Sequence, residues 1–392
     1  MQTKDQRVAT SVDPATTGVQ AGAFGFLCAL AVGALLVVGA KLQVSDLGAG
    51  ASPLSIFETI VLAGLGSLGA PVQLGGADVM VLPLGAIAFV VCGIASAARR
   101  ASLDVSRGET EPRLASHLRV VAATAATLAI TCALAAWLFR IGDVGVDPFG
   151  AAVAGSLWGA VGALLAMVPP PGWAFRGFVL GRAEESGRPA WLVAGARAAL
   201  WVVLCSLVAL AVLAFARFLF RTSSPLAAVG WLIHGIAFAP NLAAAGAAVA
   251  LGGSVEAGFG AIAATTAAPE YSLFDWAGGP TPAFAWLLPL LPLACVVAAG
   301  IRLSTIQAGR TKVVPILARL AGASFVFATT LSLLALAGEA RAGVVENEGF
   351  ALLAADPIEV FVLALGWAAV GLPLGWGLGL IVRRRSKKRE TR

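Results

Sequence analysis

The chain contains repeated apolar runs of about 20 residues, and no other feature restricts its fold as strongly. A run of this length crosses a hydrocarbon core as a helix, and lipid leaves backbone groups no partners outside a helix or a closed barrel. Barrel strands would alternate over about ten residues, and these runs do not alternate. Charged residues make up only 12% of the chain. The sequence therefore predicts an all-α polytopic transmembrane helix bundle with about 8–10 membrane helices.

Ten segments account for this prediction. The shortest of them, 54–70, is interrupted by glycines near its end and carries Glu58. The other nine have the length and composition of crossings or near-crossings: 21–40, 79–98, 120–139, 149–168, 198–216, 226–252, 282–301, 316–337 and 358–382.

Charges between these segments predict the orientation, because loops rich in Lys and Arg stay in the cytoplasm. Segments 99–119, 171–197 and 302–313 and the basic C-terminus should be inside, and the acidic loops 253–281 and 338–357 outside. This pattern requires 226–252 to enter and leave on one face, and 54–70 to be re-entrant or interfacial. Pro240 lacks a backbone N–H and disrupts helix interiors, so we expect a broken helix at this position. Both termini are then cytoplasmic.

Two pairs of similar stretches indicate an internal repeat. "DPFGAAVAGSLWGAVG" (147–162) and "DPIEVFVLALGWAAVG" (356–371) share seven of sixteen positions, and "LPLGAIAFVV" (82–91) resembles "LPLLPLACVV" (288–297). The halves should run the same way through the membrane, as a parallel repeat. The predicted organisation is a cytoplasmic tail (1–20), a first repeat (21–170), a basic linker (171–197), a second repeat (198–382) and a basic tail (383–392).

The repeated Asp-Pro should begin the last helix of each half. Asp caps a helix N-terminus well, and Pro suits the first helical position. Glycines four residues apart on these helices permit close helix–helix contact, and we expect the two helices to meet; the same steps could instead dimerise the protein. The predicted interface residues are Gly155, Gly159, Gly371, Gly375 and Gly379.

Three polar residues in the interrupted segments are candidate cavity residues: Glu58, His234 and Asn241. An ionisable group at membrane depth can relay protons or bind a substrate. The structural alternatives are that His234 bonds a backbone carbonyl or lies near the interface, and that water solvates Glu58.

No catalytic, cofactor-binding or metal-binding residues are predicted. The five cysteines lie in apolar runs without a CxxC pair, which is typical of free thiols that pack as small hydrophobes. No phosphate-binding loop of the GxxxxGK[ST] or GxGxxG kind occurs. "FRGFVLGRAEESGR" (175–188) resembles part of the intramembrane CAAX-type proteases, but its two Glu follow the motif and only His234 lies in a membrane segment. The tail "RRRSKKRETR" favours anionic lipid over nucleic acid, because it directly follows an apolar span.

"LIHGIAFAPNLAAAGAAVALGG" (232–253), "PAFAWLLPLLPL" (282–293) and "GAPVQLGGADVMVLPLG" (69–85) resemble uncharacterised actinobacterial multi-pass membrane proteins of the PerM-like cell-division and streptophobe kind. The resemblance covers about two thirds of the chain and uses low-complexity motifs. The chain departs from the pattern after "PN", where the family would have a more aromatic stretch and a Gly-Pro-Gly turn. The resemblance implies a bacterial plasma-membrane protein and carries no catalytic residues.

Two functions remain open from the sequence. The first is a non-enzymatic membrane protein that supports cell envelope or division assembly through other membrane proteins. The second is a secondary transporter or channel for a small solute, with the interrupted helices lining the path. Small-residue helix interfaces favour the first function. Paired charged residues in the interrupted segments would favour the second, but Glu58 and His234 are the only ionisable candidates that the sequence analysis finds there.

Overall fold

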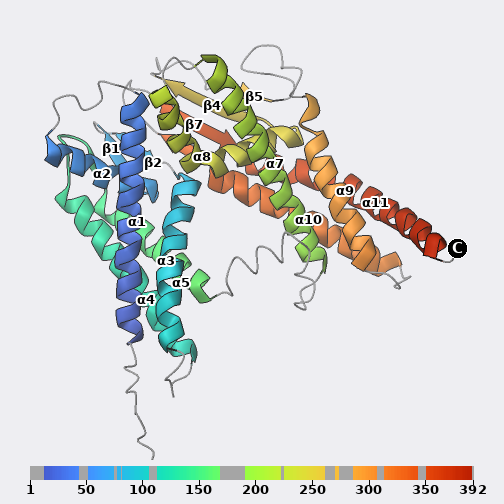
Figure 1. Ribbon diagram of the computed structural model, residues 1–392, viewed down its shortest axis with the longest axis horizontal. Helices are drawn as coiled ribbons and strands as arrows, with labels where there is room; N and C mark the ends of the chain where they lie inside the picture. The colour runs from blue at the N-terminus through green and yellow to red at the C-terminus, as the bar shows by residue number, and fades with distance from the viewer. Residues whose placement is uncertain are drawn as a thin grey trace, which may run out of the picture. The chain divides into compact units, whose positions relative to one another are not determined.

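Two compact units divide the chain. Unit 1 comprises Met1–Pro170 together with Val229–Ile236, and unit 2 comprises Pro171–Ala228 together with Ala237–Arg392. The segment 229–236 thus belongs to unit 1, although the sequence analysis placed it in the second repeat. The computed structural model (Figure 1) describes residues 13–43, 52–74, 77–80, 82–105, 113–167, 190–221, 225–260, 270–272, 286–306, 313–342 and 350–390.

Ten helices lie within these described ranges, and each overlaps one of the ten predicted apolar segments. Seven are long and apolar enough to cross a membrane, and three shorter apolar helices accompany them. The protein is therefore an all-α, multi-pass membrane protein, as predicted. The helices are α1 (Pro14–Gln43), α2 (Pro53–Ser67), α3 (Leu84–Val105), α4 (Arg113–Leu138), α5 (Pro148–Met167), α7 (Ala190–Arg221), α8 (Pro225–Leu251), α9 (Leu290–Ile306), α10 (Val313–Gly338) and α11 (Pro357–Glu390).

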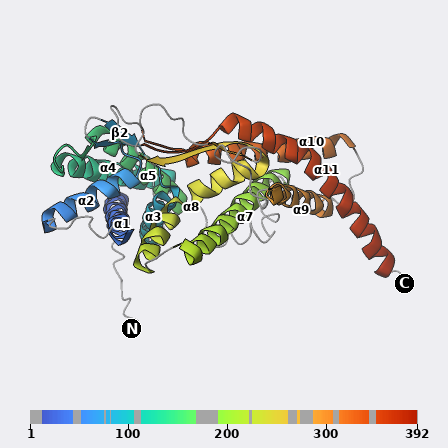
Figure 2. The ribbon, with the colours of Figure 1, turned by 90° about the horizontal axis from the view of Figure 1, so that it is seen from above.

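In unit 1, α2 lies across α1 (Figures 1 and 2). Glycines permit the crossing, because a Cβ placed on Gly33 would lie 2.6 Å from the Gly64 nitrogen. A Cβ on Gly64 would in turn lie 2.7 Å from the Ala29 carbonyl oxygen. At about 1.5 Å per residue, the 15 residues of α2 extend about 22 Å, which is less than a hydrocarbon core of about 30 Å. This helix is too short to cross a bilayer by itself.

Three short antiparallel strands connect helix ends in unit 1. The middle strand β1 (Val72–Leu74) follows α2, β2 (Ala77–Met80) precedes α3, and β3 (Gly145–Val146) precedes α5. Val72 pairs with Val79 of β2 on one side and with Val146 of β3 on the other. The strands therefore hold the C-terminal end of α2 and the N-terminal ends of α3 and α5 at one end of the unit.

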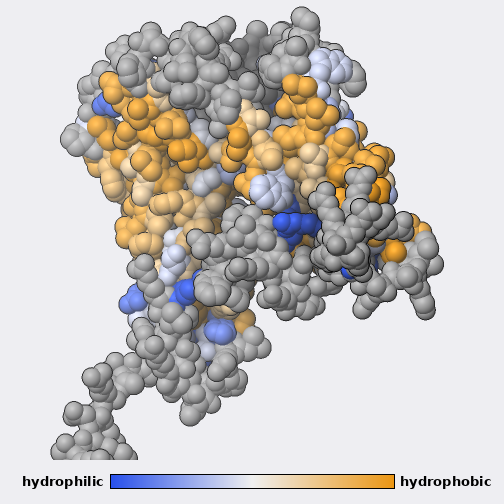
Figure 3. Space-filling model, turned by 45° about the vertical axis from the view of Figure 1, so that its right-hand side comes forward, coloured by the Kyte–Doolittle hydropathy of each residue, from blue (hydrophilic) through white to orange (hydrophobic). Residues whose placement is uncertain are grey.

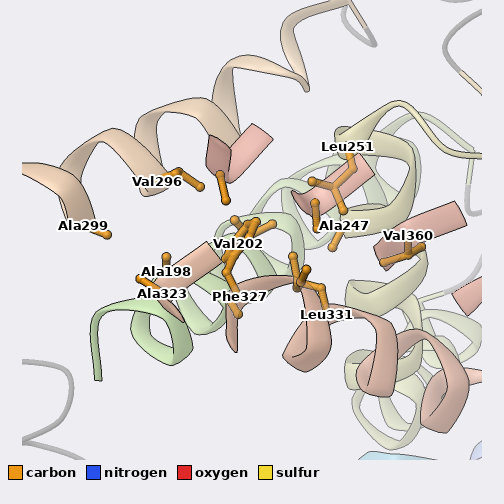
Figure 4. Packing of buried hydrophobic residues seen from close by; sticks show 14 of the residues in the cluster. Ala198, Val202, Ala247, Leu251, Val296, Ala299, Ala323, Phe327, Leu331 and Val360 are labelled. Atoms are coloured by element: carbon orange, nitrogen blue, oxygen red, sulfur yellow. The ribbon is translucent and has the colours of Figure 1, made fainter. Parts of the chain in front are cut away.

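Unit 2 repeats the helix contacts of unit 1. The last helix, α11, packs against α9 and α10, and α7 packs against the same two helices. In unit 1, α5 and α1 each pack in this way against α3 and α4. The unit 2 core lies between these helices (Figure 4), where Phe327 of α10 is 1% exposed and Val202 of α7 is fully buried.

The strands of unit 2 have the register of those in unit 1. Strand β4 (Val255–Gly260) follows α8 and lies between β5 (Glu270–Tyr271) and β7 (Phe350–Ala355), which precedes α11. Val255 pairs with Tyr271 on one side and with Ala355 on the other, so it takes the place that Val72 has in unit 1. A further strand, β6 (Ala340–Ala342), pairs with β7. The sequence analysis missed all these strands.

The second helix of each unit ends in the same way. Leu68, the C-cap of α2, and Leu251, the last residue of α8, are each followed by a glycine with positive φ, +84° at Gly69 and +99° at Gly252. The next residue donates its N–H to a carbonyl five positions back, at 3.4 Å in unit 1 and 3.0 Å in unit 2. This is the Schellman termination, in which glycine adopts the left-handed conformation without a Cβ penalty. Both helices therefore stop at a Leu-Gly pair.

The last helix of each unit begins at the repeated Asp-Pro, and the predicted caps are confirmed. The Gly150 N–H donates to Asp147 Oδ2 at 2.6 Å, and the Ile358 N–H donates to Asp356 Oδ1 at 2.8 Å. Each proline is the first helical residue, where a missing N–H costs nothing. The repeated Asp-Pro thus forms the same N-terminal cap on the last helix of each unit.

Helix α8 corrects one sequence prediction. It is a single helix from Pro225 to Leu251 with Pro240 inside it, so the expected interruption is wrong. Proline removes only one intrahelical hydrogen bond, and the apolar sequence on both sides keeps the remaining backbone groups paired. A continuous helix of 27 residues has no turn at which the chain could reverse, so the hairpin-like re-entrant path expected for this segment is absent from α8.

Large apolar side chains cover the outer faces of the helices (Figure 3). On α4, Trp137 is 70% exposed and Ile130 is 59% exposed, and on α10 Leu333 is 59% exposed. Small residues occupy the opposite faces, where Ala123 and Ala323 lie near the glycines of α1 and α7. This inversion, with small residues inside and large apolar ones outside, suits a bundle in lipid.

Candidate functional site

The three predicted cavity residues lie in α2 and α8, the second helices of the two units. Glu58 and Asn241 occupy matching positions, because each lies ten residues before the leucine of the Leu-Gly pair at which its helix stops. Their surroundings differ. Glu58 is half-buried in unit 1, whereas Asn241 is fully buried in unit 2.

Asn241 binds the end of another helix. Its Nδ2 donates to the carbonyl oxygen of Gly338, the last residue of α10, at 3.2 Å. The final carbonyls of a helix have no partner within the helix, and a buried one needs a donor from elsewhere. Asn241 therefore serves as a side-chain cap for α10 and is a structural residue of unit 2.

His234 lies in the part of α8 that belongs to unit 1, next to the end of α1. Its Nδ1 is 3.0 Å from the Gly230 carbonyl oxygen and 3.2 Å from Gln43 Nε2. With a proton on Nδ1 it donates to Gly230, and without one it accepts from the Gln43 amide. A Cβ on Gly39 would lie 2.9 Å from the imidazole, so glycine lets the two helices approach closely. His234 thus joins α8 to α1, in line with the carbonyl-bonding alternative.

The two repeated tryptophans have a role that the sequence did not reveal. Trp158 Nε1 donates to the Leu68 carbonyl oxygen at 2.8 Å, and Trp367 Nε1 donates to the Leu251 carbonyl oxygen at 2.8 Å. Each acceptor is at the end of the second helix of its unit. An indole N–H needs a partner when it is buried, and a helix C-terminus has carbonyls to offer. The last helix of each unit therefore caps the second helix.

The five predicted interface glycines all face a neighbouring helix of their own unit. A Cβ on Gly155 would lie 2.9 Å from the Leu128 carbonyl oxygen, and one on Gly371 would lie 2.9 Å from Val296 Cγ1. Gly159 approaches Ala125 of α4, Gly375 the carbonyl of Val297, and Gly379 the hydroxyl of Ser304. These glycines pack α5 on α4 and α11 on α9 within their own units; that the two helices also meet each other stays a prediction.

Glu359 is a polar residue that the sequence analysis overlooked. It lies in the first turn of α11, and its Oε2 accepts from both the N–H and the hydroxyl of Ser254 at 3.2 Å. Ser254 directly precedes β4. An acid in the first turn of a helix, three residues after the Asp cap, was the available signal, because such positions favour carboxylates. The bond secures the loop between α8 and β4.

These polar groups form hydrogen bonds to backbone groups that would otherwise lack partners near helix ends. Asn241, Trp158, Trp367 and Glu359 each bind a backbone group at or just beyond the end of a helix or loop. Within the part of the chain that the structure describes, no three His, Cys, Asp or Glu side chains are grouped to hold a metal ion. His234 makes its hydrogen bonds within unit 1 and Asn241 binds Gly338 within unit 2.

Comparisons with protein-family models, with curated proteins and with solved structures found no match to this chain.

Proposed function

We propose that this multi-pass membrane protein is non-catalytic and supports cell envelope or division assembly by binding other membrane proteins. The supporting observation is the use of its polar side chains: Trp158, Trp367 and Asn241 stabilise helix ends within each unit. A transporter would keep such groups for solute or ions in a wet path. Here they stabilise the folded form of two compact units, which is what a scaffold requires.

The proposal places the protein in a bacterial plasma membrane with both termini in the cytoplasm. The strand ends of the units then face outward. The arrangement of unit 1 supports this orientation, because the N-terminus of α1, the C-terminal end of α3 with Arg99 and the N-terminal end of α4 with Arg119 lie at the end opposite the strands. The basic C-terminal tail would bind anionic lipid on the inner leaflet.

The proposal also includes a parallel tandem repeat in which the two units derive from one ancestral unit. Four features support it: the common order of helix contacts, the matching register around Val72 and Val255, the two Leu-Gly terminations and the two tryptophan caps. Independent origins would have to produce each of these separately.

The outward strands are the proposed partner surface. Glu256 on β4 is exposed and pairs through its backbone with Ala354 of β7, so its position is fixed while its side chain is free to meet another protein. Backbone pairing in a sheet presents side chains at defined places. A carboxylate at this place would suit a basic partner segment.

Crosslinking in living cells tests this function. A photoreactive amino acid at position 256 should yield a discrete protein adduct, and one at the lipid-facing position 333 should not. Deletion of the gene should change cell length or envelope integrity, and Glu256→Lys should reproduce part of that change. Unchanged cells after deletion, together with no protein adduct at position 256, would refute the proposal.

Solute transport is the second candidate, and the half-buried carboxylate of Glu58 is the observation that favours it. A carboxylate on a helix that lies across the bundle could bind a cation or a proton. Proteoliposomes that carry the wild-type protein should then show a solute or proton flux, and Glu58→Gln should abolish it without loss of folded protein. Equal fluxes for both proteins would eliminate Glu58 as a transport residue.

A further inference from the structure

The segment Val229–Ile236 of α8 contacts the C-terminal end of α1 within unit 1. A Cβ placed on Gly39 would lie 3.2 Å from Ile233 Cγ2, and one placed on Gly230 would lie 2.9 Å from Gln43 Cγ. These two glycines let the helices approach closely along one face of the segment. Large apolar side chains on its other faces are exposed: Trp231, Leu232 and Ile236.

The polar part of this contact is the imidazole of His234, which is half-buried. Its Nδ1 lies 3.2 Å from Gln43 Nε2 and 3.0 Å from the Gly230 carbonyl oxygen. An amide nitrogen only donates, so the bond to Gln43 needs the lone pair of a neutral imidazole on Nδ1. The Gly230 carbonyl already accepts the backbone N–H four residues on in the continuous helix, and it does not require an imidazole donor.

The charges on the two helices in contact disfavour a protonated His234. Helix α8 contains no Asp, Glu, Lys or Arg, and Lys41 is the one such residue of α1. Lys41 is exposed and lies two residues from both Gly39 and Gln43, about half a turn away from the contact face. An imidazolium at position 234 would therefore meet no carboxylate on either helix, and the charged group of α1 is another cation.

We propose that the hydrogen bond between His234 and Gln43 is a pH-sensitive contact that holds Val229–Ile236 on α1. Protonation of Nδ1 turns the acceptor into a donor, so two N–H groups oppose each other and the new proton turns to the Gly230 carbonyl. The bond uses the neutral imidazole, so it is present at high pH and lost as the pH falls. Imidazole is the side chain that ordinarily changes its charge between about pH 5 and 8. Acid therefore releases the segment from α1.

Nitrogen NMR tests the protonation state directly, because the chain has two histidines. His117→Gln, a change on α4, leaves His234 as the one imidazole in protein labelled with ¹⁵N-histidine and held in lipid nanodiscs. At about pH 8 the spectrum should show a bare Nδ1 and a protonated Nε2, and at about pH 5 two protonated nitrogens. A neutral imidazole with its proton on Nδ1 at the higher pH would overturn the proposal.

Electron spin resonance measures the release. Spin labels introduced as unnatural amino acids at the exposed positions 38 and 232 leave the native cysteines unchanged. The ratio of separated to closed molecules should rise about fivefold or more between about pH 8 and pH 5, which corresponds to the loss of one hydrogen bond. The midpoint of this rise should coincide with that of the imidazole titration, and two separate midpoints would count against the proposal.

Two variants separate this contact from a general effect of acid. His234→Gln cannot ionise, and its amide oxygen can accept from Gln43, so the segment should stay closed at both pH values. His117→Gln is the matched control and should respond to acid as the wild-type protein does. Equal distances at both pH values in the wild-type protein would overturn the proposal, as a Gln43 amide turned to accept from Nδ1 would produce. An equal rise in His234→Gln would overturn it as well.

Discussion

Helices α2 and α8 end alike but begin differently. Both stop at a Leu-Gly pair, and both receive a tryptophan N–H from the last helix of their unit. Yet α2 has 15 residues and α8 has 27, and all the additional length precedes the shared end. The comparison shows that the C-terminal end of this element is fixed by specific bonds, whereas its N-terminal end is free to vary.

The additional part of α8 has its own role. It includes Val229–Ile236, the segment that belongs to unit 1, where His234 meets Gln43. Pro240 cannot donate to the Ile236 carbonyl four residues back, and that residue is the last one of the segment. The series of backbone hydrogen bonds along α8 therefore lacks one bond where the chain passes from one unit to the other. Helix α8 thus contributes residues to both units, whereas α2 belongs to unit 1 alone.

The largest expected difference between the two helices concerns their matching polar positions. Asn241→Ala should lower the free energy of unfolding by about 2 kcal/mol, because it leaves the buried Gly338 carbonyl without this donor. Glu58→Ala should change it by less than about 0.5 kcal/mol, since the side chain is half-buried. Unfolding in sodium dodecyl sulfate, followed by circular dichroism, measures both. Equal losses in the two variants would contradict the assignment of Asn241 as a cap.

The glycine terminations should differ by a smaller amount. Gly252→Ala should cost about 1 kcal/mol, because alanine is disfavoured at positive φ. Gly69→Ala should cost about 2 kcal/mol, because its Cβ would also collide with the Leu82 side chain. Gly366→Ala on α11, which has open space around it, is the control and should not destabilise. If both terminal variants behaved like the control, the Schellman terminations would not contribute to stability.

The two tryptophan caps should have the smallest and most equal effects. Trp158→Phe and Trp367→Phe each keep an aromatic ring but lose one hydrogen bond to a helix end, worth about 1 kcal/mol. Thiol labelling reports on each unit separately. Trp158→Phe should speed labelling of Cys132 in unit 1, and Trp367→Phe should speed labelling of Cys295 in unit 2. Unequal effects above about 1 kcal/mol would argue against equivalent roles in the two units.

Much of the fold could be read from the sequence. Lipid forces a long apolar run into a helix, so all ten predicted segments appear as helices. Asp147 and Asp356 were also predictable as caps, because capping depends on residues two or three positions away.

The short strands were not predictable, because runs such as "VQL" and "FALLAA" carry no distinct pattern. They pair only because the packed helices bring their ends together. The stretch "FRGFVLGRAEESGR" (175–188) and the side chains of residues 384–392 in the basic tail lie outside the described residues.

By itself the sequence determined the number and type of the membrane elements, because those depend on local hydrophobicity and on caps a few residues away. Only the tertiary structure decided which groups meet: Trp158 with Leu68, Trp367 with Leu251, and Asn241 with Gly338. The physical reason is distance along the chain. These partners are 90 to 116 residues apart and come together only through helix packing. Which small-residue face of a helix meets which neighbour is settled only when all the helices are assembled.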